Sequence, residues 1–148
     1  MGLNMKTAEQ LLEEYTTTAF RDIHRSASLF SEDGAYEAPY LESLGLPWRY
    51  QGRDQVEQYF GLLRDTYPQL AFHDVEIVCV TERCVVAEYE FTTRSSKTGR
   101  VIHQLLVGRL EAADGQIQLL RESVNLVEFA LATYVNGLAD CKVPDYRD

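Results

Sequence analysis

The sequence has few of the residues that build disulfide frameworks and metal sites. Its three cysteines, Cys79, Cys84 and Cys141, form no CxxC pair, which is typical of reduced thiols that pack as small apolar side chains. Cys79 and Cys84 flank a short turn, so a contact between them across a hairpin stays open. The three histidines show no metal-ligand spacing, and there is no Gly-rich phosphate loop or GxSxG motif. We therefore expect neither a metal nor a cofactor.

Basic residues are also scarce. Lysine and arginine number 14 against 23 acidic residues, which gives a net charge of −9, and no basic cluster stands out. Nucleic acids and anionic membrane surfaces both need dense Lys/Arg footprints, so we expect neither as a partner. Apolar runs such as 77–80 are too short to span a bilayer, and the N-terminus lacks the basic start and apolar stretch of a signal peptide. These observations favour a cytoplasmic location.

Helical periodicity dominates the first half of what we predict to be a single domain at 7–139, followed by a C-terminal tail at 140–148. A capping box, Thr7 with Gln10, precedes the first helix. A short second helix at 24–30 ends in a polar turn at 31–34, and a third follows Asp54 and stops before Pro68. The apolar stripes of the first and third helices are Leu11, Leu12, Tyr15 and Ala19, and Val56, Tyr59, Phe60 and Leu63.

From residue 71 onward the period changes from 3.6 to 2. This pattern predicts hairpin strands at 72–80, 84–93, 101–111 and 116–125. A short strand at 35–40 and an aromatic-rich loop at 41–52 come earlier, and 126–139 forms either a last helix or a strand. Helices followed by a run of strands predict an α+β domain, in which a curved antiparallel sheet folds around the N-terminal helices.

The strand predicted at 101–111 carries apolar residues on both faces. They include Val101, Ile102, Leu105, Leu106 and Val107. A sheet with one face in water would alternate instead. Because the helices cover only the inner face, the simplest cover for the outer face is a second copy of the chain. We therefore expect a homodimer formed through the outer sheet face.

An adjacent arginine and glutamate, Arg121 and Glu122, interrupt the strand predicted at 116–125. Successive strand side chains point to opposite faces, and Glu122 shares its face with Leu120 and Val124. Desolvation between apolar neighbours raises the pKa of a carboxyl, which suits proton transfer near neutral pH. A structural ion pair or a solvated edge explains the same pattern equally well. Glu122 is nevertheless the leading catalytic candidate.

Several motifs together resemble one known family. Glu32-Asp33-Gly34, Gly52-Arg53-Asp54, Tyr67-Pro68, Asp114-Gly115 and the stretch Arg121-Glu122-Ser-Val-Asn125 are similar to those of phenazine-biosynthesis A/B proteins, members of the SnoaL-like, or nuclear-transport-factor-2-like, superfamily. The resemblance extends over residues 7–139. It implies a cone-shaped sheet wrapped around helices, an enclosed apolar pocket and a dimer. It also implies that Glu122 is an acid or base in that pocket.

The same resemblance assigns further positions. The pocket histidine of the phenazine-biosynthesis proteins falls on or near Tyr59, which removes one proton-transfer partner. In ketosteroid isomerase, of the same superfamily, the general-base aspartate falls on Ala38, the oxyanion-hole aspartic acid on Leu106 and the oxyanion-hole tyrosine near Glu14 or Tyr15. The loss of both carboxylates argues against steroid isomerisation. The residues that the comparison implies face the pocket are Ile102, Gln104, Leu106, Leu120, Glu122 and Val124.

The remaining pocket candidates each have a functional and a structural interpretation. Tyr15 and Tyr59 either donate a catalytic hydroxyl or pack in the core. Gln104 binds either a ligand or the backbone. Tyr89 belongs to an aromatic inner stripe of its strand, which would contact a substrate.

The aromatic residues of the long loop allow two positions. Trp48 and Tyr40, together with Tyr50, form either a lid over the pocket mouth or packing on the sheet rim. Glu37 lies beside the position of the family base, but should point away from it into solvent. His103 is expected on the outer sheet face.

These observations lead to one functional hypothesis and one alternative. The hypothesis is a cofactor-independent enzyme that performs acid/base chemistry, such as isomerisation, cyclisation, condensation or dehydration, on a small apolar or aromatic metabolite. Glu122 would move the proton, and a tyrosine hydroxyl or Gln104 would stabilise negative charge on oxygen. The alternative is a non-catalytic ligand-binding or dimerisation module with the same fold. An acid accompanied by a hydroxyl donor favours chemistry, whereas an acid alone favours binding.

Overall fold

Three helices precede most of the sheet in the computed structural model, which describes residues 5–18 and 20–147. The capping box is confirmed, because Thr7 N donates to Gln10 Oε1 at 2.9 Å and Gln10 N donates to Thr7 Oγ1 at 3.2 Å. Ala19 of the predicted apolar stripe and Asp148 of the predicted tail lie outside the described residues. The helices are α1 (Ala8–Thr18), α2 (Ile23–Ser28) and α3 (Arg53–Thr66).

The six-stranded sheet has the order β2-β1-β6-β5-β4-β3. Its strands are β1 (Phe30–Glu37), β2 (Arg49–Gln51), β3 (His73–Val80), β4 (Cys84–Arg94), β5 (Val101–Ala113) and β6 (Gln116–Ser123). All neighbours are antiparallel except β1 and β6, which run parallel. The predicted α+β class and curved sheet are confirmed, but the parallel pair was not predicted. Its partners lie far apart in the sequence, where hairpin signals carry no information.

The polar turn predicted at 31–34 is wrong, because these residues belong to β1. The strand register shifts between Phe30 and Ala35, which lets a polar segment continue the strand through an irregularity. Gly34 permits the close approach to β6, since a Cβ at this position would lie 2.6 Å from the carbonyl oxygen of Ile117. The strand predicted at 35–40 therefore starts earlier and ends at Glu37.

The segment predicted as a long loop is partly regular. It contains the 3₁₀ helix η1 (Pro39–Leu44) and the short strand β2. The C-terminal segment, for which both helix and strand were open, forms α4 (Leu126–Thr133) and the 3₁₀ helix η2 (Gly137–Asp140). The side chain of Asn125 caps α4 by accepting from the backbone of Glu128.

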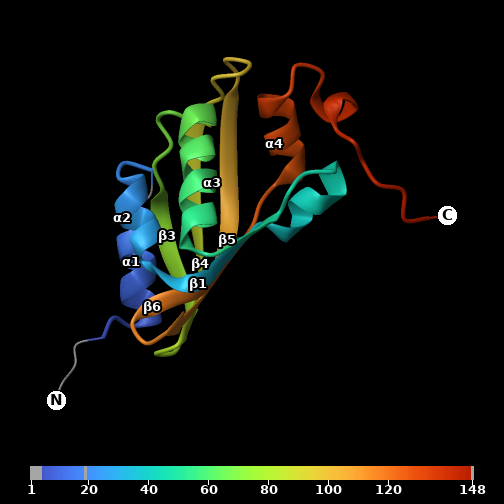
Figure 1. The fold of residues 1–148 in the computed structure, drawn as a ribbon. Coiled ribbons are helices and arrows are strands. Elements are labelled where there is room, and N and C mark those ends of the chain that lie inside the picture. The colour runs from blue at the N-terminus through green and yellow to red at the C-terminus, as the bar shows by residue number, and fades with distance from the viewer. Residues whose placement is uncertain (1–4, 19, 148) are drawn as a thin grey trace.

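The helices cover one face of the sheet and leave the other open (Figure 1). Helix α3 crosses in front of β4 and β5, α1 and α2 lie near β3, and α4 and η1 lie at the opposite end of the molecule. An aromatic cluster fills the space between the layers, with Phe60 of α3 contacting the rings of Tyr15, Phe30 and Tyr36. On the open face, Val101 and Leu105 are 50% and 56% exposed.

Glu37 is buried, which contradicts the predicted solvent exposure. Its side chain is 2% exposed and accepts hydrogen bonds from Arg49 and from Arg121, whose Nη2 lies 2.6 Å from Oε1. The register explains the burial, because β2 places Arg49 and β6 places Arg121 directly opposite Glu37. Two half-exposed guanidinium groups therefore cover the carboxylate.

The cysteines and the helices settle two further expectations. Cys79, Cys84 and Cys141 are all free thiols, and the hairpin register places Cys79 opposite Val86, away from Cys84. Within residues 5–18 and 20–147, every helix is too short or too polar to cross a bilayer.

Candidate functional site

Glu122 lies at the centre of the domain and accepts hydrogen bonds from three tyrosines. Its side chain projects from β6 toward the helices and is 4% exposed. Tyr15 of α1 donates to Oε2 at 2.9 Å, Tyr89 of β4 donates to Oε2 at 2.5 Å, and Tyr36 of β1 donates to Oε1 at 2.5 Å. Three elements that lie far apart in the sequence thus bring their hydroxyl groups to one carboxylate.

The electrostatics of this cluster depend on burial. Burial raises the pKa of Glu122 above its ordinary value, and the hydrogen bonds from Tyr36, Tyr89 and Tyr15 partly oppose that rise by favouring the ionised form. Burial and the neighbouring carboxylate hold the pKa values of all three tyrosines well above the ordinary value. The phenols therefore remain donors, and the group that can exchange a proton is Glu122.

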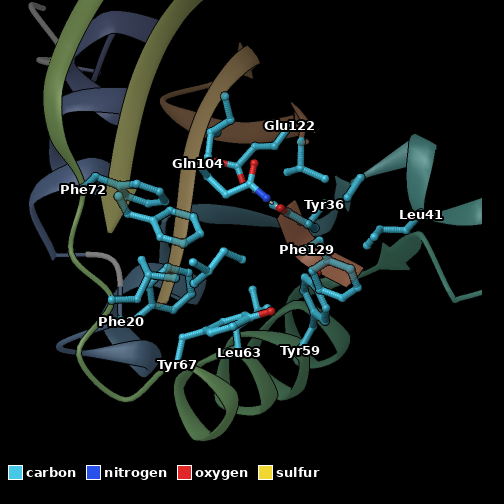
Figure 2. Close-up of a pocket in the computed structure, with 16 residues that line it drawn as sticks. Phe20, Tyr36, Leu41, Tyr59, Leu63, Tyr67, Phe72, Gln104, Glu122 and Phe129 are labelled. Atoms are coloured by element: carbon cyan, nitrogen blue, oxygen red, sulfur yellow. Dashed lines mark hydrogen bonds between the residues drawn. The ribbon is translucent and has the colours of Figure 1, made fainter. Parts of the chain in front are cut away.

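Glu122 borders a hollow of about 50 Å³ between the sheet and the helices (Figure 2). Its walls are mostly apolar and aromatic, with Phe20 and Phe72 on one side and Leu41 and Phe129 on the other. Figure 2 shows Glu122 and Gln104 at one end of the hollow, opposite the α3 side chains of Tyr59 and Leu63. A carboxylate in such surroundings has little contact with water.

The structure brings several predicted residues to this hollow. Tyr59, Ile102, Gln104, Leu106 and Val124 line it together with Glu122. Of the two predicted catalytic tyrosines, Tyr59 lines the hollow without a hydrogen-bond partner for its hydroxyl in the described ranges. Its ring stacks on Tyr50 with centroids 4.0 Å apart.

Other predicted residues lie behind the lining or elsewhere. Tyr15 and Tyr89 are fully buried and hold Glu122 without lining the hollow. Leu120 is buried in the core but is also absent from the walls. The amide of Gln104 is bound to the backbone: Nε2 donates to Asn125 O at 2.9 Å, and Asn125 N donates to Oε1 at 2.8 Å. Of the two partners that the sequence left open for Gln104, a ligand or the backbone, its amide binds the backbone in this structure.

The aromatic lid is not observed in this structure. Tyr40 is 56% exposed, and Trp48 is half-buried against the core; neither lines the hollow. The helix η1 explains this placement, because it buries Leu41 and Leu44 on its inner side and turns Tyr40 outward. Of this segment, Leu41 lines the hollow, whereas the sequence had left a lid and packing on the sheet rim open for the aromatic residues.

Two residues of the site escaped sequence analysis. Tyr36 lies within the strand predicted at 35–40 and was not named as a candidate, although strand alternation places it on the face of Ala38, the position on which the general base of ketosteroid isomerase falls. Gly108 lies opposite Glu122 in the β5–β6 register. A Cβ on Gly108 would meet the hydroxyl oxygen of Tyr89 at 2.1 Å, so only glycine leaves room for the tyrosine that holds Glu122.

One group of potential metal ligands lies away from the hollow. His73, Asp74 and Glu90 each offer a ligand atom, and these atoms lie within 4.8 Å of one another at the β3–β4 edge. His73 and Asp74 are exposed, and His73 Nδ1 lies 2.6 Å from Asp74 Oδ2. As predicted, His103 is on the outer face. Its Nδ1 forms a hydrogen bond with Thr92 Oγ1 at 2.8 Å, and its Nε2 lies 3.4 Å from Glu90 Oε1.

Structures with the same fold include proteins of several activities. A phenazine biosynthesis-related protein from Pseudomonas aeruginosa has a TM-score of 0.76 and 18% identity, over 85% of this chain and 80% of that chain. A protein with a ketosteroid isomerase-like fold from Catenulispora acidiphila, in complex with trimethylamine, has a TM-score of 0.70 and 12% identity, over 86% and 94% of the two chains. A candidate polyketide cyclase from Xanthomonas campestris has a TM-score of 0.73 and 21% identity, over 89% and 100%.

Because all three sequence identities are low, these likenesses establish the fold alone. A comparison with curated proteins found no significant match. The sequence itself matches the model of the SnoaL-like domain over residues 9–120, which is most of the chain and agrees with the resemblance drawn from its motifs. The chain therefore belongs to the SnoaL-like domain family.

Proposed function

We propose that this protein is a cofactor-independent enzyme that catalyses proton transfer on a small apolar or aromatic metabolite. One observation carries the proposal: a buried carboxylate, Glu122, lines an apolar hollow and is held there by three tyrosine hydroxyl groups. Buried carboxylates with raised pKa values and defined orientation are typical of general acid/base sites.

The hydrogen-bond pattern determines which oxygen would act. Oε2 of Glu122 accepts from both Tyr15 and Tyr89, whereas Oε1 accepts only from Tyr36. Oε1 therefore keeps a lone pair for an incoming proton, and Tyr36 also lines the hollow. Tyr15 and Tyr89 would act as positioning residues, which keep the carboxylate from rotating.

A proton-transfer cycle can be written with the residues present. The Oε1 lone pair removes a proton from a carbon next to a carbonyl group, and the C–H electron pair moves into an enolate whose negative charge is on the carbonyl oxygen. The free hydroxyl of Tyr59 would donate a hydrogen bond to this oxygen. Return of the proton to another carbon gives an isomer; alternatively, the enolate carbon attacks a second carbonyl, whose π electrons move to its oxygen, and this oxygen takes the proton back from Glu122 to give a cyclic or intermolecular aldol product.

The likeness to a candidate polyketide cyclase supports this class of chemistry without naming the substrate. In this fold the pocket residues decide the reaction, so the activity has to be argued from Glu122 and its neighbours. The acid is accompanied by hydroxyl donors, which is the arrangement that favours chemistry over simple binding.

Deuterium exchange tests the proposal before the substrate is known. We expect the protein to speed the incorporation of solvent deuterium next to the carbonyl group of at least one compound in a panel of cyclic and aromatic ketones, measured by mass spectrometry in D₂O. Heat-denatured protein at the same concentration is the control. Binding of panel members in a thermal-shift assay without exchange into any of them would support the alternative, a non-catalytic binding module.

We also propose that the protein is a homodimer formed through the open sheet face. Exposed Leu105 and Val107 lie at its centre on β5. A two-fold axis parallel to β5 would stack the exposed apolar residues of the two copies on each other, which removes them from water.

The dimer predicts different effects for two equally exposed leucines. Leu105 on β5 is 56% exposed and Leu62 on α3 is 57% exposed. Leu105→Glu should shift the protein from dimer to monomer, because it places like charges opposite each other across the two-fold axis. Leu62→Glu, on the helical side, should remain dimeric. Light scattering coupled to size-exclusion chromatography measures both, and a monomeric wild type would refute the dimer.

A further inference from the structure

A second hollow of about 210 Å³ lies next to the one that contains Glu122. The two hollows share five lining residues: Leu41, Tyr59, Leu63, Tyr67 and Phe129. These side chains come from η1, α3, α4 and the residue that ends α3, so they form a thin wall between neighbouring spaces. We call the space beside Glu122 the inner chamber and the other the outer chamber.

The inner chamber is too small to hold an aromatic metabolite by itself. Its volume of about 50 Å³ has room for a few water molecules, whereas ligand pockets are several times larger. A ligand that reaches Glu122 must therefore extend into the outer chamber. Leu41, Leu63 and Phe129 of the wall are apolar side chains that can change rotamer without breaking a hydrogen bond.

The outer chamber has a different chemical character from the inner one. Tyr50, stacked on Tyr59, lies on one side, and Tyr134 lies on another. Lys97 is the one charged side chain among the lining residues. Its Nζ lies 5.8 Å from the centre of the Tyr134 ring, and no carboxylate of residues 5–18 and 20–147 forms an ion pair with it.

Lys97 is exposed, and because it has no ion-pair partner among the described residues, it favours an anionic group on a ligand in this chamber. The protein carries a net charge of −9, so its overall field does not attract anions, and the preference must come from this local cation. A ligand carboxylate in the inner chamber would face Glu122 in a space with little water, which is strongly unfavourable. The two charged residues would therefore orient the ligand, with its anion at Lys97.

We infer that the two chambers are one ligand site and that the ligand is an elongated aromatic or conjugated carboxylic acid, with its carboxylate at Lys97 and its reacting carbon at Glu122. This inference rests on the proposed function for the role of Glu122. The binding of the anion at Lys97 depends only on the outer chamber, so the two can fail separately.

A pair of probes that differ only in charge tests the anion site. The probes are 2-naphthoate and 2-naphthamide, whose binding to the full chain near neutral pH is measured by calorimetry. The wild type should bind the carboxylate more tightly. Lys97→Gln should weaken naphthoate binding by about 5-fold, which is the upper end of what an exposed charge pair contributes, and should leave naphthamide binding unchanged. Lys6→Gln, which alters an exposed lysine paired with Glu14 on α1, should leave both affinities unchanged.

A second variant tests the connection between the chambers. Leu63→Trp adds bulk to a half-buried wall residue and should weaken both probes at least about 10-fold, since it fills space that the naphthalene ring needs. Thermal unfolding shows whether the variant remains folded. If Leu63→Trp does not fold, the same measurement is made on Phe129→Trp, which adds bulk to the wall residue of α4.

The outcomes separate the inference from the proposed function. An unchanged ratio of the two affinities in Lys97→Gln, or no binding of either probe to the wild type, would overturn the inference. Normal binding of both probes to the folded wall variant would overturn the single site. Glu122→Gln should bind naphthoate as well as the wild type does, so an anion effect at Lys97 stands even if no exchange activity is found.

Discussion

Replacing Glu122 with glutamine should lower turnover by about 10²- to 10⁴-fold, the contribution expected of a general base, and leave ligand affinity nearly unchanged. The carboxamide has almost the same shape; its oxygen can accept from Tyr15 and Tyr89 while its NH2 group donates to the hydroxyl of Tyr36, but it cannot take up a proton. The deuterium-exchange rate of the best ketone in the panel measures the effect, with affinity determined separately by calorimetry.

The pH profile gives an independent measure of the same residue. Burial raises the pKa of Glu122, and a general base works only when deprotonated, so exchange should fall as pH is lowered through that raised pKa.

The pH dependence of the free energy of unfolding follows from the same raised pKa of Glu122. With a folded pKa above the unfolded one, the contribution of Glu122 to stability is present below the unfolded pKa and is lost as pH rises through the folded pKa. Glu122→Gln should therefore gain stability relative to the wild type as pH rises across this window.

A second buried glutamate provides the matched control. Glu37 is 2% exposed, but it faces the outer side of the sheet and is paired with Arg49 and Arg121. Glu37→Gln should reduce stability, because the arginines lose a charged partner, and should keep the exchange rate at the wild-type level. Equal rates for Glu122→Gln and the wild type would remove the catalytic role proposed for Glu122.

Gly108→Ala should lower the free energy of unfolding by about 1–3 kcal/mol, the range for inserting a methyl group into a packed core. The added Cβ would lie 2.1 Å from the hydroxyl oxygen of Tyr89 and 2.7 Å from its Cζ. The whole ring must move, and its hydrogen bond to Glu122 would be stretched or broken. Because this hydrogen bond lowers the pKa of Glu122, its loss should raise that pKa further.

Two measurements separate the local effect from general damage. Urea unfolding gives the free energies, and carbon-13 NMR of the Glu122 carboxyl, assigned with Glu122→Gln, follows its titration. Gly61→Ala is the control, since a Cβ there meets nothing within 4 Å and alanine should stabilise helix α3 by about 0.5–1 kcal/mol. A Gly108→Ala protein with wild-type stability and an unshifted Glu122 titration would show that the tyrosine does not need this glycine.

The helices and hairpin strands were predictable because their signals are local. The Thr7–Gln10 capping box and the stripe around Tyr59 each lie within a few turns of one helix. The alternation in β4, β5 and β6 was sufficient to place Glu122 on the inner face.

The errors in the prediction have the same physical origin in each case. A polar sequence at 31–34 resembles a turn, and only the irregular parallel pairing with β6 makes it a strand. Glu37 looked exposed because its two arginine partners come from different strands, β2 and β6. Each of these residues is defined by a partner that is distant in the chain, and no local period reports such a partner.

Short-range periodicity and capping were enough to predict the α+β architecture and the inward direction of one carboxylate, and short motifs carried the family resemblance. Three features are visible only in the folded chain: Tyr15, Tyr36 and Tyr89 meet at Glu122, Gly108 makes room for one of these tyrosines, and Lys97 borders a chamber next to this site. These contacts join helices and strands whose relative positions depend on packing across the whole core, which is a property of the folded chain and of no single segment.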